Sequence, residues 1–428
     1  MHILITGASG FIGGHLVRCL MQSGHQITGC VRDPRTAASR CPEVRFIQTD
    51  FTRDLAITDW LPRLQGVDLV INAVGIIREQ GSQRFDTLHR DAPIALFRAC
   101  AKARVKRVLQ ISALGADETA VSRYHLSKKA ADDILTGLDL SWTILMPSIV
   151  YGPGAKSMAF FAALASLPLT PLVDRGDQLI QPIHVNDLTH AVERIVNDDI
   201  ANGMRVELVG PHPVFMRALF TKLRHWLGYG TPRFVSVSYA DTLRLARLAG
   251  FLSGTPVNDE TVAMLQRGNT GDVTRFVDTF GFLPKSLDQV LADNPARDAD
   301  RWHAGLYFIR PLLTLSIAFV WIFTGIISAC VIPQETSYGM LAKAGIGGLW
   351  APLMLYGASA VDLLLGVAVL TRTRPLTTGM AQLLLIFVYT LIISFSQPEQ
   401  WLHPFGPVSK NAPMMAAILI WMILERRP

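Results

Sequence analysis

Ser112, Tyr124 and Lys128 are the residues whose types and spacing point most directly to chemistry. Tyr124 and Lys128 are four positions apart, so on a helix they lie on one face, one turn apart. A phenol titrates near ~10 and is a poor base at neutral pH, but a neighbouring ammonium favours the phenolate. The pattern predicts acid–base catalysis, in which Tyr124 exchanges a proton, Lys128 lowers its pKa and Ser112 holds a substrate oxygen. A retained but idle site is the competing hypothesis.

A glycine-rich turn near the N-terminus is the second chemical feature. Gly7 permits a tight turn, Gly10 lets the backbone approach a phosphate, and Gly13 allows a helix to pack close to a strand. Free N–H groups and the helix dipole then face the phosphates of a dinucleotide. A turn that binds no ligand is the alternative. The residues expected to surround the phosphates are Thr6, Gly7, Ser9, Gly10, Phe11, Ile12 and Gly13.

The end of the second expected strand distinguishes NADP from NAD. An acidic residue there accepts a hydrogen bond from the ribose 2′-hydroxyl of NAD, whereas an arginine pairs with the 2′-phosphate of NADP. The strand ends Val31-Arg32-Asp33, with Arg35 nearby. Because Arg32 comes first, we expect NADP(H) to be favoured, while Asp33 leaves NAD(H) open. Arg35 as an ordinary surface charge is the alternative.

Strands that alternate with helices are expected to position these residues. The alternation implies a parallel sheet covered on both faces, so the predicted fold is an α/β Rossmann fold, a doubly wound parallel sheet with a small substrate lobe. Residues 1–285 would form this domain, with the lobe mainly within 151–285, and 286–304 look like a polar linker. The expected strands are 2–6, 26–31, 44–48, 69–73, 107–112, 141–146, 205–209 and 233–237. The clearest expected helices are 11–22, 84–103 and 124–136.

The composition indicates that part of the chain lies in lipid. The chain has 428 residues, too many for one ordinary core, and only 17% of them are charged. The net charge of +6 comes without a long lysine or arginine run, so we expect no nucleic-acid partner. The five cysteines are scattered, which predicts neither a disulfide framework nor a metal site. The N-terminal residues lack the pattern of a signal peptide.

Residues 305–428 are predicted to form an all-α, four-helix transmembrane domain. Three apolar runs are long enough to cross ~30 Å of hydrocarbon as helices, and one of them is interrupted by Asp362. The last run is short and spans only if its helix begins near Gly406. Buried helices of a soluble domain are the alternative. The four runs are 312–332, 346–370, 376–396 and 412–424.

Positive charges predict the orientation of this tail. Arginines precede the first run, separate the second from the third, and follow the fourth, whereas the other loops carry only Lys343 and Lys410. Positive residues mark the cytoplasmic side. We therefore expect a multi-pass protein of the inner (plasma) membrane, with the Rossmann domain and both termini in the cytoplasm. The arginines concerned are Arg301, Arg310, Arg372, Arg374, Arg426 and Arg427.

The N-terminal part resembles the extended and atypical branch of the short-chain dehydrogenase/reductase superfamily. Its Gly-x-x-Gly-x-x-Gly spacing carries the resemblance, which extends over residues 1–200. The resemblance implies a nicotinamide cofactor, with Lys128 on its ribose, Asp50 and Phe51 near the adenine, and further contacts at two later turns. Those turns match family motifs as Asn72-Ala73-Val74-Gly75 and Pro147-Ser148-Ile149-Val150-Tyr151-Gly152-Pro153, and His184-Val185-Asn186-Asp187 matches a downstream one.

The interval between Ser112 and Tyr124 is short for extended members of that superfamily. It is similar to that of the atypical branch which includes the NADPH-binding accessory subunit of respiratory complex I, where catalysis is often in question. Ser122 is an alternative to Ser112 if the loop folds differently. His125 and Lys129 are expected to face solvent.

The tail resembles DoxX-like four-helix membrane domains. The likeness lies in Asp362-Leu363-Leu364-Leu365-Gly366 and in Pro407-Val408-Ser409-Lys410-Asn411-Ala412-Pro413. A carboxylate inside a span is costly unless it is paired or hydrated. Asp362 therefore marks either a polar pocket for a proton or a quinone, or a hydrogen bond between helices, which we favour. The expected interfacial tryptophans are Trp302, Trp350 and Trp401.

Three functions compete at this level. The leading hypothesis is a membrane-anchored NAD(P)-dependent oxidoreductase that acts on a lipophilic or membrane-derived alcohol or carbonyl, with a lipid or quinone-like small molecule as its partner. The second is a non-catalytic NADPH-binding subunit or assembly factor of a membrane redox complex. The third is an epimerase or dehydratase, which recycles its cofactor internally. The sequence does not identify the substrate.

Overall fold

The computed structural model describes residues 1–249 and 258–426. The described chain forms two compact units, Met1–Ala304 and Gly305–Pro428. Residues 286–304, which we expected to be a polar linker, belong to the first unit and are largely helical. They contain α12 (Leu287–Asp293) and the start of α13 (Asp298–Ile326). The reason is packing: Leu287 and Val290 on α12 are buried in an apolar cluster with residues of α8 (Met216–Trp226).

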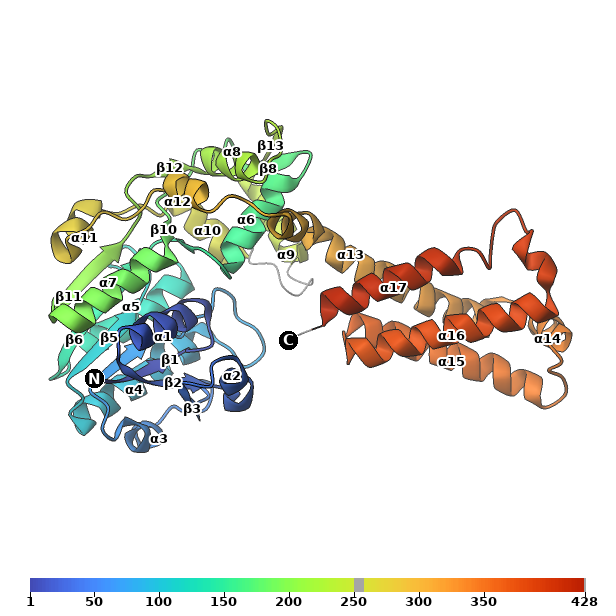
Figure 1. Cartoon of the computed structure of the whole chain (residues 1–428), viewed down its shortest axis with the longest axis horizontal. Helices are drawn as coiled ribbons and strands as arrows, with labels where there is room; N and C mark the ends of the chain where they lie inside the picture. Colours follow the sequence, from blue (N-terminus) through green and yellow to red (C-terminus); the bar gives the residue numbers. More distant parts are fainter. Residues whose placement is uncertain (250–257, 427–428) are drawn as a thin grey trace. The chain divides into compact units, whose positions relative to one another are not determined.

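The first unit is built on a seven-stranded, all-parallel sheet within the described residues (Figure 1). The strand order is β11-β6-β5-β4-β1-β2-β3. The order reverses between β1 and β4, which is the position where open α/β sheets bind ligands at their carboxyl edge. The doubly wound Rossmann fold is therefore confirmed. Its strands are β1 (His2–Thr6), β2 (Gln26–Val31), β3 (Arg45–Gln48), β4 (Leu69–Asn72), β5 (Arg107–Ile111), β6 (Ser141–Pro147) and β11 (Met204–Leu208).

Helices cover both faces of this sheet, so its strands carry nearly continuous runs of apolar residues. The helices on one face are α1 (Phe11–Gln22), α7 (Val185–Asp198) and α11 (Val273–Phe280). Those on the other face are α3 (Ile57–Trp60), α4 (Ala92–Ala103) and α5 (Arg123–Thr136). The helix expected at 84–103 is in fact two segments, because a π-helix, η2 (Asp86–Asp91), precedes α4.

The segment in which we expected the substrate lobe contains short helices and three small two-stranded sheets. The strand expected at 233–237 is present as β13 but pairs with β8 instead of joining the main sheet. The helices are α6 (Lys156–Ser166), α8, α9 (Tyr239–Ala249) and α10 (Asp259–Arg267). The strands are β7 (Val150–Tyr151), β8 (Thr170–Val173), β9 (Leu179–Ile180), β10 (Ile183–His184), β12 (Val214–Phe215) and β13 (Phe234–Val237).

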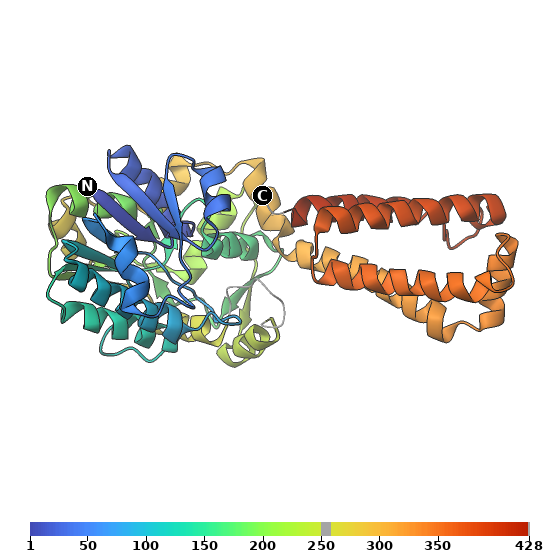
Figure 2. The same cartoon turned by 90° about the horizontal axis from the view of Figure 1, so that it is seen from below.

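The second unit is a bundle in which α13, α15, α16 and α17 run alongside one another (Figure 2). In the described part of the chain, three helical segments are long and apolar enough to cross a membrane. These are Asp298–Val331, where η3 (Ile327–Val331) extends α13, α15 (Trp350–Leu370) and α16 (Pro375–Ser396). The fourth, α17 (Asn411–Glu425), is apolar but shorter. Two connecting helices that we did not expect are α14 (Gln334–Lys343) and η4 (Pro398–Trp401).

A buried carboxylate joins three parts of this bundle at one end. Arg310 on α13 donates to both oxygens of Glu425 on α17, at 2.7 and 2.8 Å. Arg372, in the turn between α15 and α16, lies 3.6 Å from the same carboxylate. Arg310 and Arg372, two of the arginines that we expected on one side of the membrane, therefore share one end of the bundle. Arg427 lies outside the described residues.

Asp362 lies on the face of α15 that packs against α13. A Cβ atom on Gly325 of α13 would come within 2.9 Å of Leu363, and one on Gly366 within 3.1 Å of the Ile322 backbone nitrogen. Asp362 is buried, and its Oδ1 makes no hydrogen bond to the described residues. The Asp362 carboxyl group interacts with the Thr324 side chain of α13, and a hydrogen bond between helices stays our prediction for its role.

Arg107 on β5 connects the sheet to the end of α7. Its buried guanidinium donates to Thr143 Oγ1 at 2.7 Å, to Asp199 Oδ1 at 3.0 Å and to the carbonyl oxygen of Ile200. Replacing Arg107 by Ala would leave these acceptors without their donor, and we expect a loss of about 3 kcal/mol in the free energy of unfolding of the first unit. Urea unfolding of the detergent-solubilised chain measures this. Lys106→Ala, which removes an exposed pair with Asp68, serves as the control and should leave the midpoint unchanged.

Candidate active site

The glycine loop lies at the carboxyl end of β1, against the end of β4. Gly7 has a φ of +67°, and a Cβ there would come within 2.8 Å of the Ala73 carbonyl oxygen. A Cβ on Gly13 would overlap the Gly7 carbonyl oxygen. Gly10 is the N-cap of α1, and no described side chain caps the helix. The first N–H groups of α1 are thus free for a ligand, which is the arrangement that binds dinucleotide phosphates.

The side chains of the remaining residues of this segment differ in direction: some are exposed at the loop and others are buried in the core. Ser9 is exposed, while Phe11 and Ile12 are half-buried. The side chain of Thr6 points into the sheet, because its hydroxyl donates to Asn72 Oδ1 at 2.6 Å. Thr6 therefore supports the loop from below and does not face the phosphates with its hydroxyl.

The end of β2 carries the charges that would select the cofactor. Asp33 caps α2 (Pro34–Arg40), since its carboxylate accepts from the backbone N–H groups of Arg35 and Thr36 at 3.1 and 3.2 Å. Hydrogen bonds from Thr36 hold the pKa of Asp33 below its usual range. Arg32 and Arg35 are exposed, and their side chains make no hydrogen bond or ion pair among the described residues. The acidic group is thus engaged in a helix cap, whereas both guanidinium groups are available.

Asp50 and Phe51, which follow β3, differ in whether their side chains can reach a ligand. Asp50 turns its carboxylate to Thr52, accepting from the backbone N–H at 3.0 Å and from the hydroxyl at 2.7 Å. Although partial burial would raise the pKa of Asp50, these hydrogen bonds and the nearby arginines, Arg32 among them, lower it. Phe51 is buried, with its ring edge-on to Trp60 at 5.3 Å between centroids. The Phe51 side chain therefore belongs to the core and not to an adenine contact.

The turns after β4 and β6 reach the same edge of the sheet. Ala73 and Val74 are half-buried and Gly75 is exposed, where a Cβ would lie 3.4 Å from Lys128 Nζ. Pro147 is buried, while Ile149 and Val150 are half-buried. Further along, Tyr151 and His184 stack edge-on, with 5.1 Å between ring centroids. This part of the site is held by parallel pairing of β7 with β10.

Lys128 is the most constrained of the candidate catalytic residues. Its ammonium is buried and donates to the carbonyl oxygens of Val74 at 3.2 Å and of Ile111 at 3.0 Å, at the ends of β4 and β5. These contacts occupy two of its three N–H donors. Within the described residues the third N–H has no acceptor, so it can donate to a ligand. Burial lowers the pKa of Lys128 to about 8.

Tyr124 lies one turn before Lys128 on α5, as the spacing predicted. Its ring packs edge-on against Phe85, His89 and His125, at 5.9, 5.3 and 5.2 Å between centroids. Burial, assisted by the Asp132 carboxylate, raises the pKa of Tyr124 to about 12. The phenol is therefore protonated at neutral pH, which suits a proton donor better than a base.

Ser112 follows β5 and is buried, with its hydroxyl donating to Asp132 Oδ2 in a short hydrogen bond. Ser122, the alternative to Ser112, is the N-cap of α5 and hydrogen-bonds the His125 ring at 2.9 Å. The expectation that His125 faces solvent is wrong: the Ser122 cap draws it inward, and it is only 4% exposed. Lys129 is largely covered by ion pairs with Glu118 and Asp133.

Two buried residues of this site were missed by the sequence argument. His89 on η2 accepts from the Ile76 N–H through Nε2 at 3.0 Å and lies 3.1 Å from Ser127 through Nδ1. Burial and the Lys128 charge hold its pKa well below 6.5, so it is neutral. Asp132 continues the four-residue spacing of Tyr124 and Lys128 along α5, a signal that could have found it. Nothing in the sequence marks the π-helix that carries His89, although such turns often occur at functional sites.

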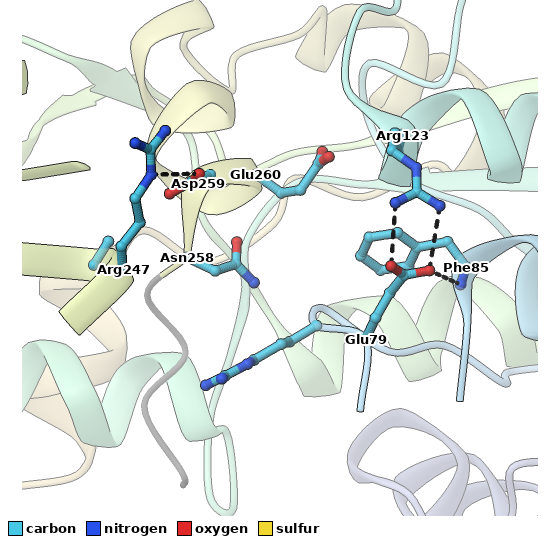
Figure 3. Close-up of a pocket in the computed structure, with 9 residues that line it drawn as sticks. Glu79, Phe85, Arg123, Arg247, Asn258, Asp259 and Glu260 are labelled. Carbon is cyan, nitrogen blue, oxygen red and sulfur yellow. Dashed lines mark hydrogen bonds and ion pairs between the residues drawn. The ribbon is translucent and has the colours of Figure 1, made fainter. Parts of the chain in front are cut away.

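A pocket of about 270 Å³ lies between the start of α5 and the start of α10 (Figure 3). Its lining includes Phe85, which contacts the Tyr124 ring, and Arg123, whose guanidinium binds the Glu79 carboxylate at 3.2 Å. On the opposite side, Glu260 of α10 points into the pocket, and its Oε2 is buried without a partner among the described residues. The pocket is thus lined by paired and unpaired charged side chains, and one of its lining residues, Phe85, contacts the Tyr124 ring.

The chain is similar to known proteins in two separate regions. Residues 3–206 match the NAD dependent epimerase/dehydratase family, and residues 318–419 match the DoxX-like family. A ceramide reductase of Caulobacter vibrioides is 34% identical over 188 residues, which cover 43% of this chain and 57% of the reductase. Subunit 9 of the NADH dehydrogenase [ubiquinone] 1 alpha subcomplex of Mus musculus is 24% identical over 248 residues, 54% of this chain and 64% of the subunit. The chain thus spans less than two thirds of these relatives.

Solved structures share the fold of the first unit. A UDP-glucose 4-epimerase of Thermotoga maritima superposes with a TM-score of 0.53 at 17% identity, covering 68% of this chain and 96% of the epimerase. An NADPH-dependent quinone oxidoreductase of Escherichia coli superposes with a TM-score of 0.55 at 20% identity, covering 68% and 99%. The chain thus combines a Rossmann-type region that matches the NAD dependent epimerase/dehydratase family with a region that matches the DoxX-like family and holds helices long and apolar enough to cross a membrane.

Proposed function

We propose that this chain is a membrane-anchored oxidoreductase that uses NAD(P)H to reduce a carbonyl group on an amphipathic lipid. The observation that carries the proposal is the placement of Lys128. Its buried ammonium binds the carbonyl oxygens of Val74 and Ile111, one helical turn after Tyr124 on α5. Because Gly7 of the glycine loop approaches Ala73 and Val74, these contacts support a site in which a proton donor, a cation and a phosphate-binding loop act together, as a hydride-transferring enzyme needs.

The residues present fit a pyridine dinucleotide. The uncapped N-terminus of α1 suits its phosphates, and the remaining N–H of Lys128 suits a ribose hydroxyl. The bound cofactor would supply the hydride. We propose NADP(H) in preference to NAD(H), because Asp33 is engaged in capping α2 while Arg32 and Arg35 are free to pair with a 2′-phosphate.

The protonation states favour reduction over oxidation at neutral pH. Reduction of a carbonyl requires a proton on the product oxygen, and the neutral Tyr124 phenol carries one. Lys128, with its pKa lowered to about 8, is still mostly charged at pH 7 and stabilises the phenolate that forms. Ser112 would hold the substrate oxygen during the transfer once its hydroxyl turns away from Asp132, to which it donates here.

A lipid substrate is supported by the second unit and by the ceramide reductase relative. A catalytic domain tethered to three apolar helices meets amphipathic molecules at the membrane surface. The pocket of Figure 3 is suited to a polar head group, since Glu260 presents an unpaired oxygen that accepts hydrogen bonds from hydroxyl or amine groups. The similarity to a ceramide reductase supports the same chemical class.

The similarity to complex I subunit 9 favours a second candidate function. In that case the chain would bind NADPH as a structural subunit or assembly factor of a membrane redox complex, and Tyr124 would be idle. An epimerase or dehydratase is a third candidate, supported by the match of residues 3–206 to that family. The three differ in whether added NADPH is consumed.

We further propose that the second unit spans the inner (plasma) membrane four times, with both of its ends in the cytoplasm. The Arg310–Glu425–Arg372 cluster gathers the basic residues at one end of the bundle, as the positive-inside rule requires for a single cytoplasmic side.

Replacing Tyr124 by Phe removes the proton donor and little else. We expect NADPH-dependent reduction of the ketone form of a ceramide to fall by at least about 100-fold, with NADPH affinity unchanged. NADPH absorbance measures turnover in mixed micelles, and Tyr239→Phe on α9 is the matched control. Undiminished activity of the Tyr124→Phe chain would support the non-catalytic subunit instead.

Replacing both Arg32 and Arg35 by Ala removes the partners of a 2′-phosphate. We expect NADPH affinity to fall by roughly tenfold or more, while NADH affinity stays unchanged. Fluorescence titration of the bound reduced nucleotide measures both, with Arg98→Ala, an exposed arginine on α4, as the control. Equal losses for the two nucleotides would contradict NADP preference.

Thiol labelling tests the orientation. In a chain with Cys330→Ser, a cysteine at Glu399 should react with a membrane-impermeant maleimide in intact cells, because the α16–α17 connection faces outward. A cysteine at Thr373, in the α15–α16 turn, should react only after the membrane is opened. Labelling in the opposite order would reverse the proposed topology.

A further inference from the structure

A row of polar side chains crosses the centre of the sheet. Thr6, Asn72 and Gln110 occupy directly paired positions on β1, β4 and β5. All three are fully buried in a sheet whose other core positions are mainly aliphatic. The Thr6 hydroxyl donates to Asn72 Oδ1 at 2.6 Å, and Asn72 Nδ2 donates to Gln110 Oε1 at 2.7 Å.

The direction of this row is fixed by a backbone group. The Val74 N–H also approaches Asn72 Oδ1, at 3.4 Å, so this atom is an acceptor of two donors and must be the amide oxygen. Asn72 Nδ2 then faces Gln110 as a donor, which makes the facing Gln110 atom its oxygen. The remaining Gln110 Nε2 group is left to donate beyond the row.

The acceptor nearest in character to that donor is the carboxyl group of Asp132 on α5. This carboxyl group is fully buried, and Oδ2 accepts from the Ser112 hydroxyl. Gln110 Nε2 and Asp132 Oδ1 are both buried, and neither makes a hydrogen bond within 3.5 Å among the described residues, but the Gln110 amide is close enough to favour the ionised carboxyl. The row thus runs from the residue before the phosphate loop to Ser112.

Stability alone does not account for this arrangement. A buried polar network that is replaced by apolar side chains of similar size often leaves a protein equally stable or more so. Here four polar residues are retained in a line whose two ends are the glycine loop and the candidate catalytic serine. A role in the reaction would explain why the line begins at the glycine loop and ends at Ser112.

We propose that Asp132 is a positioning residue that sets the direction of the Ser112 hydrogen bond, and that the Thr6–Asn72–Gln110 row assigns the two carboxyl oxygens their roles. This inference rests on the proposed reductase function. Gln110 Nε2 can only donate, and Oδ1 is the carboxyl oxygen without a partner, so we assign these two atoms to each other. A proton on the carboxyl group then resides on Oδ2, facing Ser112. Asp132 then donates to Ser112, and the serine hydroxyl is released toward the substrate carbonyl. When Asp132 is ionised, Ser112 must donate to it and can only accept from a substrate.

The groups around Asp132 set the pH at which its carboxyl group gains or loses a proton. Burial raises the pKa of Asp132 to about 6, opposed by the Ser112 hydroxyl, by Lys128 on the same helix and by Arg205 on β11. Tyr124, also on α5, is neutral. Since the protonated form prevails below this pKa, the donating state of Ser112 is populated at low pH and lost as the pH rises through about 6.

Infrared difference spectroscopy on the full chain in detergent observes the proton directly. In a chain with Asp362→Asn, which removes the buried carboxyl group of the second unit, we expect a carboxylic-acid C=O band that disappears on raising the pH through about 6 and that is absent when Asp132→Asn is added. Asp133→Asn is the control, because Asp133 is paired with Lys129 and Arg205 at the surface, and it should keep the band. A band that persists in Asp132→Asn would overturn the proposal whatever the enzymatic activity.

The pH profile of reduction gives the second test. Asparagine mimics the protonated form, since its oxygen can accept from Gln110 and its NH2 group can donate to Ser112. Asp132→Asn should therefore lose the limb of kcat/KM near pH 6 while keeping the low-pH rate. Asp132→Leu, which removes the hydrogen bond but fills the space, should lower kcat roughly tenfold or more with KM for NADPH unchanged. An unchanged profile in Asp132→Asn would refute the positioning role.

The two tests separate this inference from the proposed function. If Tyr124→Phe remains active while the carboxyl band still depends on Asp132, the reductase function fails and the buried proton site remains. If Tyr124→Phe is inactive and the band does not depend on Asp132, the reductase function is supported and the proposed role of Asp132 is refuted.

Discussion

The carbonyl groups of Val74 and Ile111 accept hydrogen bonds from the buried Lys128 ammonium, and the candidate site depends on this contact. A charge in a dry site needs such partners, because burial otherwise drives the amine to its neutral form. Both carbonyls are at strand ends, so the parallel sheet itself provides the partners. The ammonium is thereby fixed one helical turn from Tyr124, and the rest of the catalytic arrangement follows from the path of α5.

The glycine loop and the polar row bring the two halves of the site into contact. Gly7 can approach Ala73 because it has no Cβ, and this places the β1–α1 turn against the end of β4. Asn72, one residue earlier, joins the same two strands from within the sheet. Burial of Thr6 and Asn72 is tolerable because hydrogen bonds of set direction join them to each other and to Gln110. The glycine loop and the end of β5 are thus linked through side chains inside the sheet.

Buried polar groups in the second unit are also held by hydrogen-bond partners, here between apolar helices. Trp321 donates its indole N–H to Gln382 at 2.7 Å, and the Glu425 carboxylate is shared by two arginines. Polar groups between membrane helices persist when they are paired, and here they tie α13 to α16 and α17. Asp362 lies in a tight contact between α13 and α15.

The sequence by itself determined the elements whose signals are local. The helix Phe11–Gln22 and the strand Gln26–Val31 have the predicted bounds, because apolar periodicity and a stopping glycine act over a few residues. The order of strands and helices was enough for the doubly wound fold, and long apolar runs for the membrane helices. The spacing of Tyr124 and Lys128 correctly placed them on one helix.

Tertiary structure alone decided which side chains face the site. Phe51 and His125 had been placed at a ligand and in solvent, yet both are buried, because contacts with Trp60 and the Ser122 cap orient them. The partnership of Ser112 with Asp132 joins residues of a strand end and a helix, and no local pattern encodes it. Side-chain direction depends on what the rest of the chain packs against each residue, and that information is absent from spacing along the sequence.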